Sequence, residues 1–505
     1  MRQSPVTVIA ASIAWVALMS ACDGAGKPSG PPPAKIATSK RNLPNIIFLT
    51  VDTLRADHLA RYGYERNTMP AIEAFADTAV VFDQAVVPRG STRPSYASML
   101  TGLYPFRHGV RSNGVTLHED LLTLPEMLKA VGYHTAAFVS NFVLIGEMSG
   151  CDQGFDVYDD RLDDREAQRA NFERTAPHTL RAILEWLESG PPEPFFLFTN
   201  FIDPHGPYDP PARHRAMFHS TETRELRPEQ VPRYQRREGK LDFFDYRDRY
   251  DAEIRYTDAA LGVLIEELKK KGLWDGALVV FTADHGESMG EHDIYFAHHQ
   301  HLWEETTRVP FAVRLPGAGT ASSTARRVGG ISSPMDLMPT IAALLEISHD
   351  RSFDGENLLP VLTGAGEIDP QRAIFVEFPN VATPHETHAD YYAVRMASHK
   401  LLKVLDSNTG ELVGRAYFDI ACDPLEQKPV PFDATDEIHR QLQSRLDALI
   451  AEARTFTLPF VVTEYEMPLE QRADFVANRK DTRPRHVKTL TAEQIERLRS
   501  LGYVE

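Results

Sequence analysis

The stretch GSTRPSYASMLTG (90–102) places a small hydroxyl, Thr92, before an Arg-Pro-Ser corner and a short helical run, YASML. Gly90, Pro94 and Gly102 punctuate the stretch, as residues at turns and helix boundaries do. A threonine here is often a helix cap, because its oxygen accepts an otherwise unpaired backbone N–H. The alternative is a nucleophile at a helix N-terminus, where the helix dipole and free amides favour an anion. The rest of the chain has to decide between these two interpretations.

Acidic and imidazole side chains stand where three apolar runs end. Asp52 follows NIIFLTV, Asp203 and His205 follow PFFLFTNFI, and Asp284 and His285 follow GALVVFTA. A single Asp at the end of a strand is most often a turn former or a helix cap. Because ligands of open α/β sheets bind at the carboxyl ends of the strands, three such ends predict one shared site. Carboxylate with imidazole is ligand chemistry for a divalent cation such as Zn²⁺ or Mn²⁺.

Apolar runs alternate with amphipathic segments over most of the chain. The runs at 45–52, 134–140, 194–203, 276–286 and 309–317 are continuous, which is typical of buried parallel strands. Helices are predicted at 123–132, 177–188 and 250–272. Strands that alternate with helices predict a doubly wound α/β sheet.

The pattern changes near residue 366. RAIFVEF, YYAVRMASHKLLKVL and RAYFDIACDPLEQ are strand-like and spaced as hairpins, and DEIHRQLQSRLDALIAEA carries an apolar helical stripe. We therefore predict a smaller antiparallel α+β subdomain over 366–455. Residues 456–505 are expected to form an extended tail with a terminal helix, which Thr491 and Gln494 would open as a capping box.

The N-terminus has the pattern of an export signal. One positive charge in MRQ precedes the apolar run VTVIAASIAWVALMSA, and ALMSAC resembles a bacterial lipobox that ends at Cys22. We expect a lipoprotein-type signal peptide over 1–21, a lipidated Cys22 and a flexible tether over 22–44. The protein would then be exported and anchored to the membrane, facing the periplasm or the cell exterior. Cleavage near Ala21 or an uncleaved anchor are the alternatives.

Composition narrows the class of partner. The chain has 505 residues, with 71 Asp and Glu against 54 Lys and Arg, which gives a net charge of −17. Nonspecific binding to nucleic acid depends on Lys and Arg facing phosphates, so no nucleic-acid partner is expected. With Cys22 lipidated, Cys151 and Cys422 remain and could pair.

Taken together, these segments resemble the sulfatase family of the alkaline phosphatase superfamily. The matching parts run from about 45 to 430 and include FLTVDTLRADHL, STRPSYASMLTGLYPFRHGV, FIDPHGPYDPP and TADHGESMGEHDIYFAHH. The resemblance implies a large, mixed, mostly parallel sheet flanked by helices, with the active site at its carboxyl edge. It also implies a catalytic domain over 45–365, followed by the smaller antiparallel subdomain.

The family's functional positions fall on particular residues of this chain. The resemblance implies metal ligands at Asp52, Thr92, Asp284 and His285, a histidine facing the substrate anion at His205, and a group near the leaving group at His298. One divalent ion is expected, Zn, Mn or Ca, and a second that uses His205 and His298 is possible. The family's second acidic ligand falls on Thr53 and is therefore missing. We interpret Arg308 as structural, and His292, His299 and His301 as surface or supporting residues.

Thr92 departs from the family's nucleophile. That nucleophile is a Cys or Ser oxidised to formylglycine within Cys/Ser-x-Pro-x-Arg, whereas this chain has Thr-x-Pro-x-Tyr with Tyr96 in place of the arginine. Formylglycine is therefore not expected. A plain threonine lacks the second hydroxyl through which formylglycine expels sulfate, so chemistry favours phosphate or phosphonate esters.

The sequence thus predicts a metal-dependent hydrolase or group transferase that acts on anionic esters through metal-bound Thr92. His205 would stabilise charge on the transferred group, and His298 would be the general acid. A sulfuric ester hydrolase, as the family name implies, and a degenerate binding protein remain alternatives. The substrate class is a sulfated or phosphorylated glycan, lipid or small molecule. The Arg- and Pro-rich stretch 206–245 is expected to line the mouth of the site.

Overall fold

The computed structural model describes residues 36–162, 172–237, 239, 241–298, 301–317, 325–379, 389–459 and 461. The predicted signal peptide, Cys22, His299 and the predicted terminal helix lie outside these ranges. Among the helices that are described, none combines the length and the apolar character that crossing a membrane needs.

Within the described residues, nine strands form the main sheet, in the order β10-β3-β11-β7-β2-β6-β4-β5, with β12 paired to β3. Their bounds are β2 (Ile46–Val51), β3 (Val80–Val86), β4 (His134–Phe138), β5 (Val157–Asp159), β6 (Phe195–Phe201), β7 (Leu278–Ala283), β10 (Arg308–Val309), β11 (Phe311–Arg314) and β12 (Arg326–Ser332). Strands β7, β2, β6 and β4 are parallel neighbours, and Ile46 lies opposite both Phe196 and Leu278. Every residue of β2 is buried, as its continuous apolar run predicts.

The strand predicted at 309–317 exists, but its predicted parallel direction was wrong. β11 is antiparallel to both of its neighbours, β7 and β3. All four residues of its sequence FAVR are buried. A strand that is buried on both faces has a continuous apolar sequence whether it runs parallel or antiparallel to its neighbours. Because two reversals restore the original direction, β3 runs parallel to β7. The carboxyl end of β3, which was not predicted as a strand, therefore lies at the same edge of the sheet as the ends of β2 and β6.

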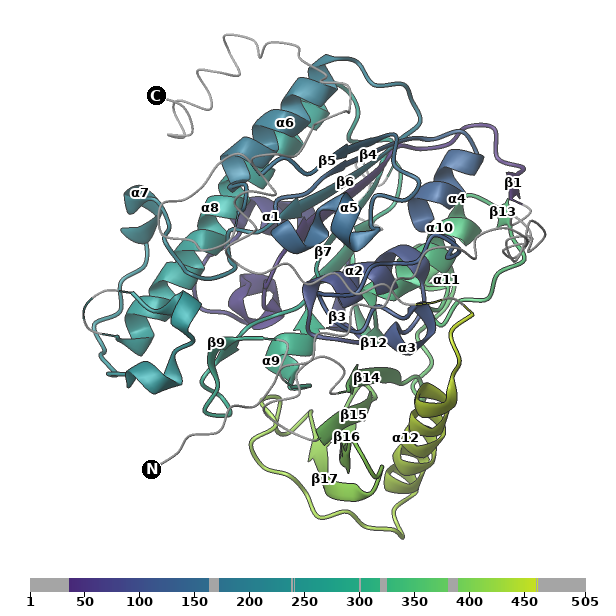
Figure 1. The fold of residues 1–505 in the computed structure, drawn as a ribbon. Helices are drawn as coiled ribbons and strands as arrows, with labels where there is room; N and C mark the ends of the chain where they lie inside the picture. The colour runs from purple at the N-terminus through teal and green to yellow at the C-terminus, as the bar shows by residue number, and fades with distance from the viewer. Residues whose placement is uncertain are drawn as a thin grey trace, which may run out of the picture. The chain divides into compact units, whose positions relative to one another are not determined.

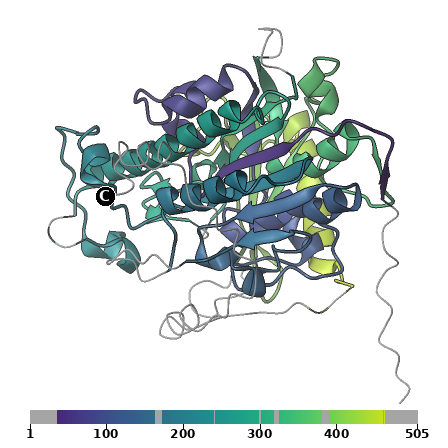
Figure 2. The same cartoon turned by 90° about the horizontal axis from the view of Figure 1, so that it is seen from above.

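Helices cover both faces of the sheet (Figures 1 and 2). On one face α1 (Pro70–Ala76) and α6 (Ala176–Glu188) pack against α8 (Phe243–Lys270), and on the other lie α2 (Thr92–Thr101), α4 (Leu124–Ala130) and α10 (Leu337–Leu344). Shorter helices are α3 (Pro105–His108), α5 (Gly146–Ser149), α7 (Ala212–Arg215), α9 (Glu304–Thr307) and α11 (Leu359–Thr363). α8 begins earlier than predicted, because Asp242 caps it by accepting hydrogen bonds from two backbone N–H groups.

The smaller antiparallel subdomain is present as predicted. Its sheet runs β14 (Ile374–Phe378), β15 (Ala389–Arg395), β16 (His399–Asp406) and β17 (Leu412–Asp419), all antiparallel. Helix α12 (Glu437–Thr455) packs on β15 and β16 through the buried residues Leu442, Leu446 and Ile450 (Figure 1). A two-stranded hairpin, β8 (Ser288–Met289) and β9 (Tyr295–Ala297), follows β7 in the main domain.

The end of the predicted tether belongs to the fold, contrary to expectation. β1 (Ala37–Thr38) pairs with β13 (Ile347–Ser348), and Thr38 Oγ1 donates a hydrogen bond of 2.6 Å to the carbonyl of Leu345. Backbone pairing to a distant strand cannot be read from a Gly- and Pro-rich composition. Cys151 is buried and Cys422 is exposed, and both are free cysteines, so the disulfide considered from the sequence does not form.

Candidate metal centre and active site

Parallel strands deliver the predicted site residues to one edge of the sheet. Asp52 follows β2, His205 follows β6, and Asp284 and His285 follow β7. Thr92 starts α2 after the short connection that leaves β3 at this same edge. The arrangement is the one that the carboxyl-end rule predicts.

Asp52, Asp284 and His285 form the one cluster in the described part of the chain that could hold a metal ion. One ligand atom from each lies within 4.8 Å of the others. His285 Nε2 is 3.8 Å from Asp52 Oδ1 and 3.6 Å from Asp284 Oδ2. All three side chains are fully buried. The structure therefore brings together three of the four predicted metal ligands.

The buried oxygens of this cluster suit a cation. Within the described residues, Asp52 Oδ1 and Asp284 Oδ2 accept no hydrogen bond. The other oxygen of each carboxylate is satisfied: Asn141 Nδ2 donates to Asp52 Oδ2 at 2.6 Å, and the backbone N–H groups of Thr53 and His285 donate to Asp284 Oδ1 at 3.2 and 2.8 Å. Two unpaired anionic oxygens side by side in the interior are costly unless a cation lies between them. The donor set therefore fits a divalent metal.

The electrostatics of the cluster agree with that conclusion. Burial and the charge of Asp284 raise the pKa of Asp52 to about 7, and burial raises the pKa of Asp284 to about 7. Burial lowers the pKa of His285, which favours the neutral imidazole. His285 Nδ1 donates a hydrogen bond of 2.9 Å to the carbonyl of Gly286, which leaves the lone pair of Nε2 facing the carboxylates.

Thr92 completes the cluster. Its Oγ1 lies 3.2 Å from His285 Nε2, to which the hydroxyl donates. The N-cap residue of α2 is Ser91, and Thr92 is the first helical residue. The capping interpretation is therefore wrong for Thr92, whose hydroxyl points to the candidate metal ligand His285.

His298 is held beside the cluster by a carboxyl group that the sequence analysis did not single out. Its Nδ1 lies 3.0 Å from Glu287 Oε1, and the other oxygen of Glu287 accepts a hydrogen bond of 3.1 Å from Tyr208 OH. Burial raises the pKa of Glu287 well above its usual range. The His298 ring centroid is 4.5 Å from that of His285 and 5.0 Å from that of His205. The predicted general acid and the predicted anion-facing histidine are thus neighbours.

Two departures from the expected family pattern are visible in the site. Thr53, at the position of the missing acidic ligand, has a φ of 54° and a buried Oγ1 that lacks a hydrogen-bond partner among the described residues. Tyr96 is buried beneath the site, 2.7 Å from Thr50 Oγ1, and its hydroxyl accepts a hydrogen bond of 2.9 Å from Asn200 Nδ2. Tyr96 thus links β2 to β6 and brings no positive charge to the site.

Other residues singled out from the sequence lie outside the cluster. Asp203 Oδ1 accepts a hydrogen bond of 2.9 Å from the backbone N–H of Ala176, at the start of α6. Arg308 begins β10 and donates a hydrogen bond of 3.1 Å to the carbonyl of Asp83, which agrees with a structural role. Neither side chain belongs to the metal cluster.

Two of the three remaining histidines are described. His292 Nδ1 lies 3.1 Å from Glu305 Oε1. His301 is buried, and its Nε2 lies 3.0 Å from Ser288 Oγ. Both support the hairpin region that carries His298 and lie outside the metal cluster, as the sequence analysis expected.

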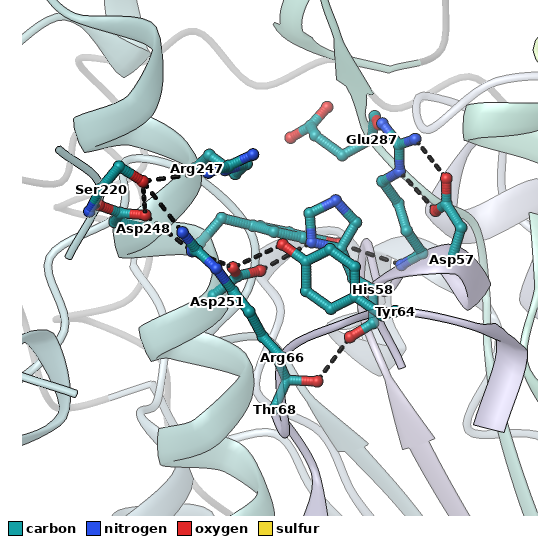
Figure 3. A network of polar contacts seen from close by, with 12 residues as sticks. Asp57, His58, Tyr64, Arg66, Thr68, Ser220, Arg247, Asp248, Asp251 and Glu287 are labelled. Carbon is teal, nitrogen blue, oxygen red and sulfur yellow. Dashed lines mark hydrogen bonds and ion pairs between the residues drawn. The ribbon is translucent and has the colours of Figure 1, made fainter. Parts of the chain in front are cut away.

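Hydrogen bonds and ion pairs with side chains of α8 hold the loop that follows Asp52 in place (Figure 3). The buried carboxylate of Asp251 lies 2.7 Å from His58 Nδ1 and accepts a hydrogen bond of 2.7 Å from Arg66 Nη1. Arg66 Nη2 donates a further bond of 3.0 Å to Ser220 Oγ. The loop after β2 and Ser220 are therefore attached to neighbouring turns of one helix, through Asp251 and Asp248.

Three supporting residues were missed by the sequence analysis. Asn141 follows β4, so the rule that found Asp52 at a strand end would also have found it. Glu287 comes two residues after His285, where a carboxylate among small residues was a usable signal. Tyr208 has no such signal, because only its contact with Glu287 shows what it does.

Comparison with known proteins agrees with this geometry. The family model described as Sulfatase matches residues 44–347, and the model described as N-sulphoglucosamine sulphohydrolase, C-terminal, matches residues 290–452. An ulvan-active sulfatase of Formosa agariphila is 26% identical over 431 residues, which is 81% of each chain.

Two solved structures share the fold. A phosphonate monoester hydrolase of Agrobacterium radiobacter superposes with a TM-score of 0.65 at 20% identity, over 84% of this chain and 100% of that one. A protein solved in complex with its substrate, D-glucosamine-2-N,6-O-disulfate, gives a TM-score of 0.66 at 21% identity, over 81% of this chain and 98% of that one. Both likenesses agree with the α/β fold class described above.

Proposed function

Because the chain belongs to the sulfatase family, we propose that it is a metal-dependent hydrolase or group transferase of anionic esters, with Thr92 as nucleophile and a preference for phosphate or phosphonate esters. One observation carries the proposal: Thr92 Oγ1 lies 3.2 Å from His285 Nε2, beside two carboxylates whose unpaired oxygens face the same point. A hydroxyl next to a metal centre at a helix N-terminus is placed for nucleophilic attack.

Asp52, Asp284, His285 and Thr92 would hold one divalent cation. Two carboxylates, an imidazole and a hydroxyl suit Zn²⁺ or Mn²⁺. Ca²⁺ prefers a larger set of oxygen ligands, and Thr53 removes one carboxylate from the expected set. When bound, the cation would lower the pKa of the hydroxyl and polarise an oxygen of the ester.

The residues of the chain divide the reaction between them. Thr92 Oγ1 attacks phosphorus, its proton passes to water, and the bond from phosphorus to the leaving oxygen breaks. His298 gives a proton to that departing oxygen, and His205 stabilises the negative charge on the transferred group. Water, or an acceptor alcohol in a transferase, then attacks phosphorus and gives its proton to His298, the bond from phosphorus to Thr92 Oγ1 breaks, and Oγ1 regains a proton from water.

The single hydroxyl of Thr92 supports phosphorus over sulfur as the atom attacked. A hydrated formylglycine expels sulfate through its second hydroxyl, and Thr92 has none. Tyr96 occupies the position of the arginine in the oxidised motif, which argues against modification. A phosphothreonine is cleaved by water at phosphorus with the help of a metal. The fold shared with a phosphonate monoester hydrolase is consistent with that chemistry.

A paired assay tests the proposal. We expect the metal-loaded protein to hydrolyse aryl phosphate or phosphonate esters with kcat/KM about tenfold or more above that for the matched aryl sulfate, which is about 1.4 kcal/mol in transition-state stabilisation. Peptide mass spectrometry over 90–107 should give the encoded mass of Thr92. A sulfate preference in protein whose Thr92 is unmodified would contradict the mechanism.

Sulfate-ester hydrolysis is the second candidate, and the relatives favour it. One relative is named an ulvan-active sulfatase, and one structural neighbour was solved with a disulfated glucosamine as its substrate. For this chain they support a sulfated glycan as the alternative substrate. The third candidate is a degenerate relative that binds its ligand without catalysis. In that case the metal-loaded protein should bind anions but turn over none of the esters.

We also propose that the protein is exported and held at a membrane through lipidated Cys22. The support is the charged start, the apolar run and the ALMSAC sequence of the N-terminus. In a bacterial host, the wild-type protein should fractionate with membranes and incorporate labelled palmitate. Cys22→Ser should incorporate none and should leave the membrane fraction or remain unprocessed. Identical fractionation and labelling of the two proteins would rule out the lipid anchor.

A further inference from the structure

Four rings lead from the metal cluster to the surface. The His298 centroid lies 4.5 Å from that of His285, and the His205 centroid lies 5.0 Å from that of His298. Tyr234 follows, with its ring 6.3 Å from that of His205 and inclined by 27°. His285 and His298 are buried, His205 is half-buried and Tyr234 is 39% exposed. The series thus runs from the buried cluster to a partly exposed ring, and Tyr234 is its outermost member.

The short helix that carries Tyr234, η5 (Arg233–Gln235), is attached to the strand beside the general acid. Tyr234 OH and Gln235 Nε2 both donate to the carbonyl of Phe296, at 3.4 and 3.2 Å. Phe296 belongs to β9, which ends immediately before His298. Tyr246 OH, from α8, donates a bond of 2.7 Å to the carbonyl of Gln235. The position of the tyrosine ring is therefore set by the same elements that position His298.

A glycine permits the contact between η5 and the His205 loop. A Cβ on Gly206 would lie 1.8 Å from Gln235 Nε2, so no other residue fits there without displacing Gln235. The segment is fastened again at Ser220, whose Oγ donates a bond of 2.7 Å to Asp248 on α8 (Figure 3). Tyr234 is thus presented in a fixed place before a substrate arrives, which lowers the cost of binding against it.

We propose that Tyr234 forms the subsite for the leaving group, and that this leaving group carries a ring that packs on the tyrosine. The inference rests on the proposed function, because it takes the anionic ester to bind at Thr92 and His285. The rings follow one another outward in the order His298, His205 and Tyr234, so a leaving group that extends along this series toward solvent would lie against Tyr234. A partly exposed aromatic ring offers a flat apolar surface for either an aryl ring or the C–H face of a sugar.

Tyr234 would determine specificity and take no part in bond breaking. Its removal should weaken binding of the ring and leave binding of the anionic head unchanged. A merely structural role, in which Tyr234 only supports His205, makes a different prediction: head groups with and without a ring would be affected alike. The two roles can therefore be separated by changing the ligand as well as the residue.

The test compares three phosphonates that share a head group and have no ester bond to cleave. Binding of phenylphosphonate, cyclohexylphosphonate and methylphosphonate to the metal-loaded full chain is measured by calorimetry. We expect at least one cyclic ligand to bind wild type about tenfold more tightly than methylphosphonate, as a well-packed ring contact provides. Tyr234→Ala should remove that advantage and leave the methylphosphonate affinity within about twofold. A preference for phenyl or for cyclohexyl indicates an aryl or a saturated, sugar-like ring.

Two further variants complete the experiment. Tyr234→Phe keeps the ring and loses only the long hydrogen bond to Phe296, so it should retain the ring preference. Met217→Ala removes another exposed apolar side chain of the same segment, 56% exposed, and should behave as wild type. Equal losses for all three ligands in Tyr234→Ala, or a ring preference that survives it, would overturn the subsite and leave the proposed function standing. Failure of metal-loaded wild type to bind any of the phosphonates would instead overturn the proposed function, and the subsite with it.

Discussion

Thr92→Ala will lower kcat/KM for the best ester substrate by about 10³–10⁴-fold, because the change removes the nucleophile. Thr92→Ser keeps a primary hydroxyl on the same first residue of α2 and should retain a measurable part of the activity. The hydroxyl is the group at issue, since Thr92 Oγ1 is the atom that lies 3.2 Å from His285 Nε2. The measurement is steady-state kinetics with metal content determined on the same samples.

The same helix provides a matched control for this prediction. Thr101 is also buried in α2, but its Oγ1 donates to the carbonyl of Ala97 at the far end of the helix. Thr101→Ala should therefore lose little activity, even if it lowers stability. Comparable losses in Thr92→Ala and Thr101→Ala would point to damage to the helix. Full activity in Thr92→Ala would exclude Thr92 as the nucleophile.

Asp52→Asn will abolish tight binding of the metal, which elemental analysis should find at about one ion per wild-type chain. The variant replaces a buried anionic ligand by a neutral side chain of the same shape, and ligand charge is what holds a divalent ion. Chelation should lower the melting temperature of wild type by several degrees, because a ligand bound at 1,000 times its Kd contributes about 4 kcal/mol. Chelation should leave the melting temperature of Asp52→Asn unchanged.

The metal-free proteins add a second readout. In metal-free wild type the carboxylates of Asp52 and Asp284 face each other in the interior, and Asp52→Asn removes one of these charges. The metal-free variant should therefore be at least as stable as metal-free wild type. Asp203→Asn is the control, since Asp203 is a buried carboxylate at a neighbouring strand end that binds the start of α6. That control should keep its metal, and a full metal load in Asp52→Asn would reject the assigned site.

Local sequence patterns were sufficient to predict the strands that carry the candidate metal ligands. The runs that became β2, β6 and β7 are buried along their whole length, and burial on both faces requires continuous apolar sequence. Asp52 and Asp284 could be predicted because a polar residue that ends such a run has to emerge at the ligand-binding edge. The stripe of Leu442, Leu446 and Ile450 likewise predicted a packed helix in the smaller subdomain.

Strand direction and neighbours were beyond the reach of these patterns. β11 reads like the parallel strands, yet it is antiparallel to β7 and β3, because side-chain burial carries no information on direction. The reversal matters for the site. It places β3 parallel to β7, and therefore brings Thr92 to the edge where Asp284 and His285 lie.

By itself, the sequence determined that two carboxylates and an imidazole stand at the ends of apolar runs, and its resemblance to a family added the hydroxyl of Thr92 to this set. Only the tertiary structure decided how these groups are supported and what surrounds them. Glu287 meets His298, and Tyr234 meets His205, through loops whose approach depends on packing against α8 and β9. The physical reason is distance along the chain. The periodicity of burial within a strand or helix depends on that element alone and can be recognised in its sequence. The partner of a buried carboxyl group or of an exposed ring belongs to a segment far away in the sequence, so only the folded structure shows it.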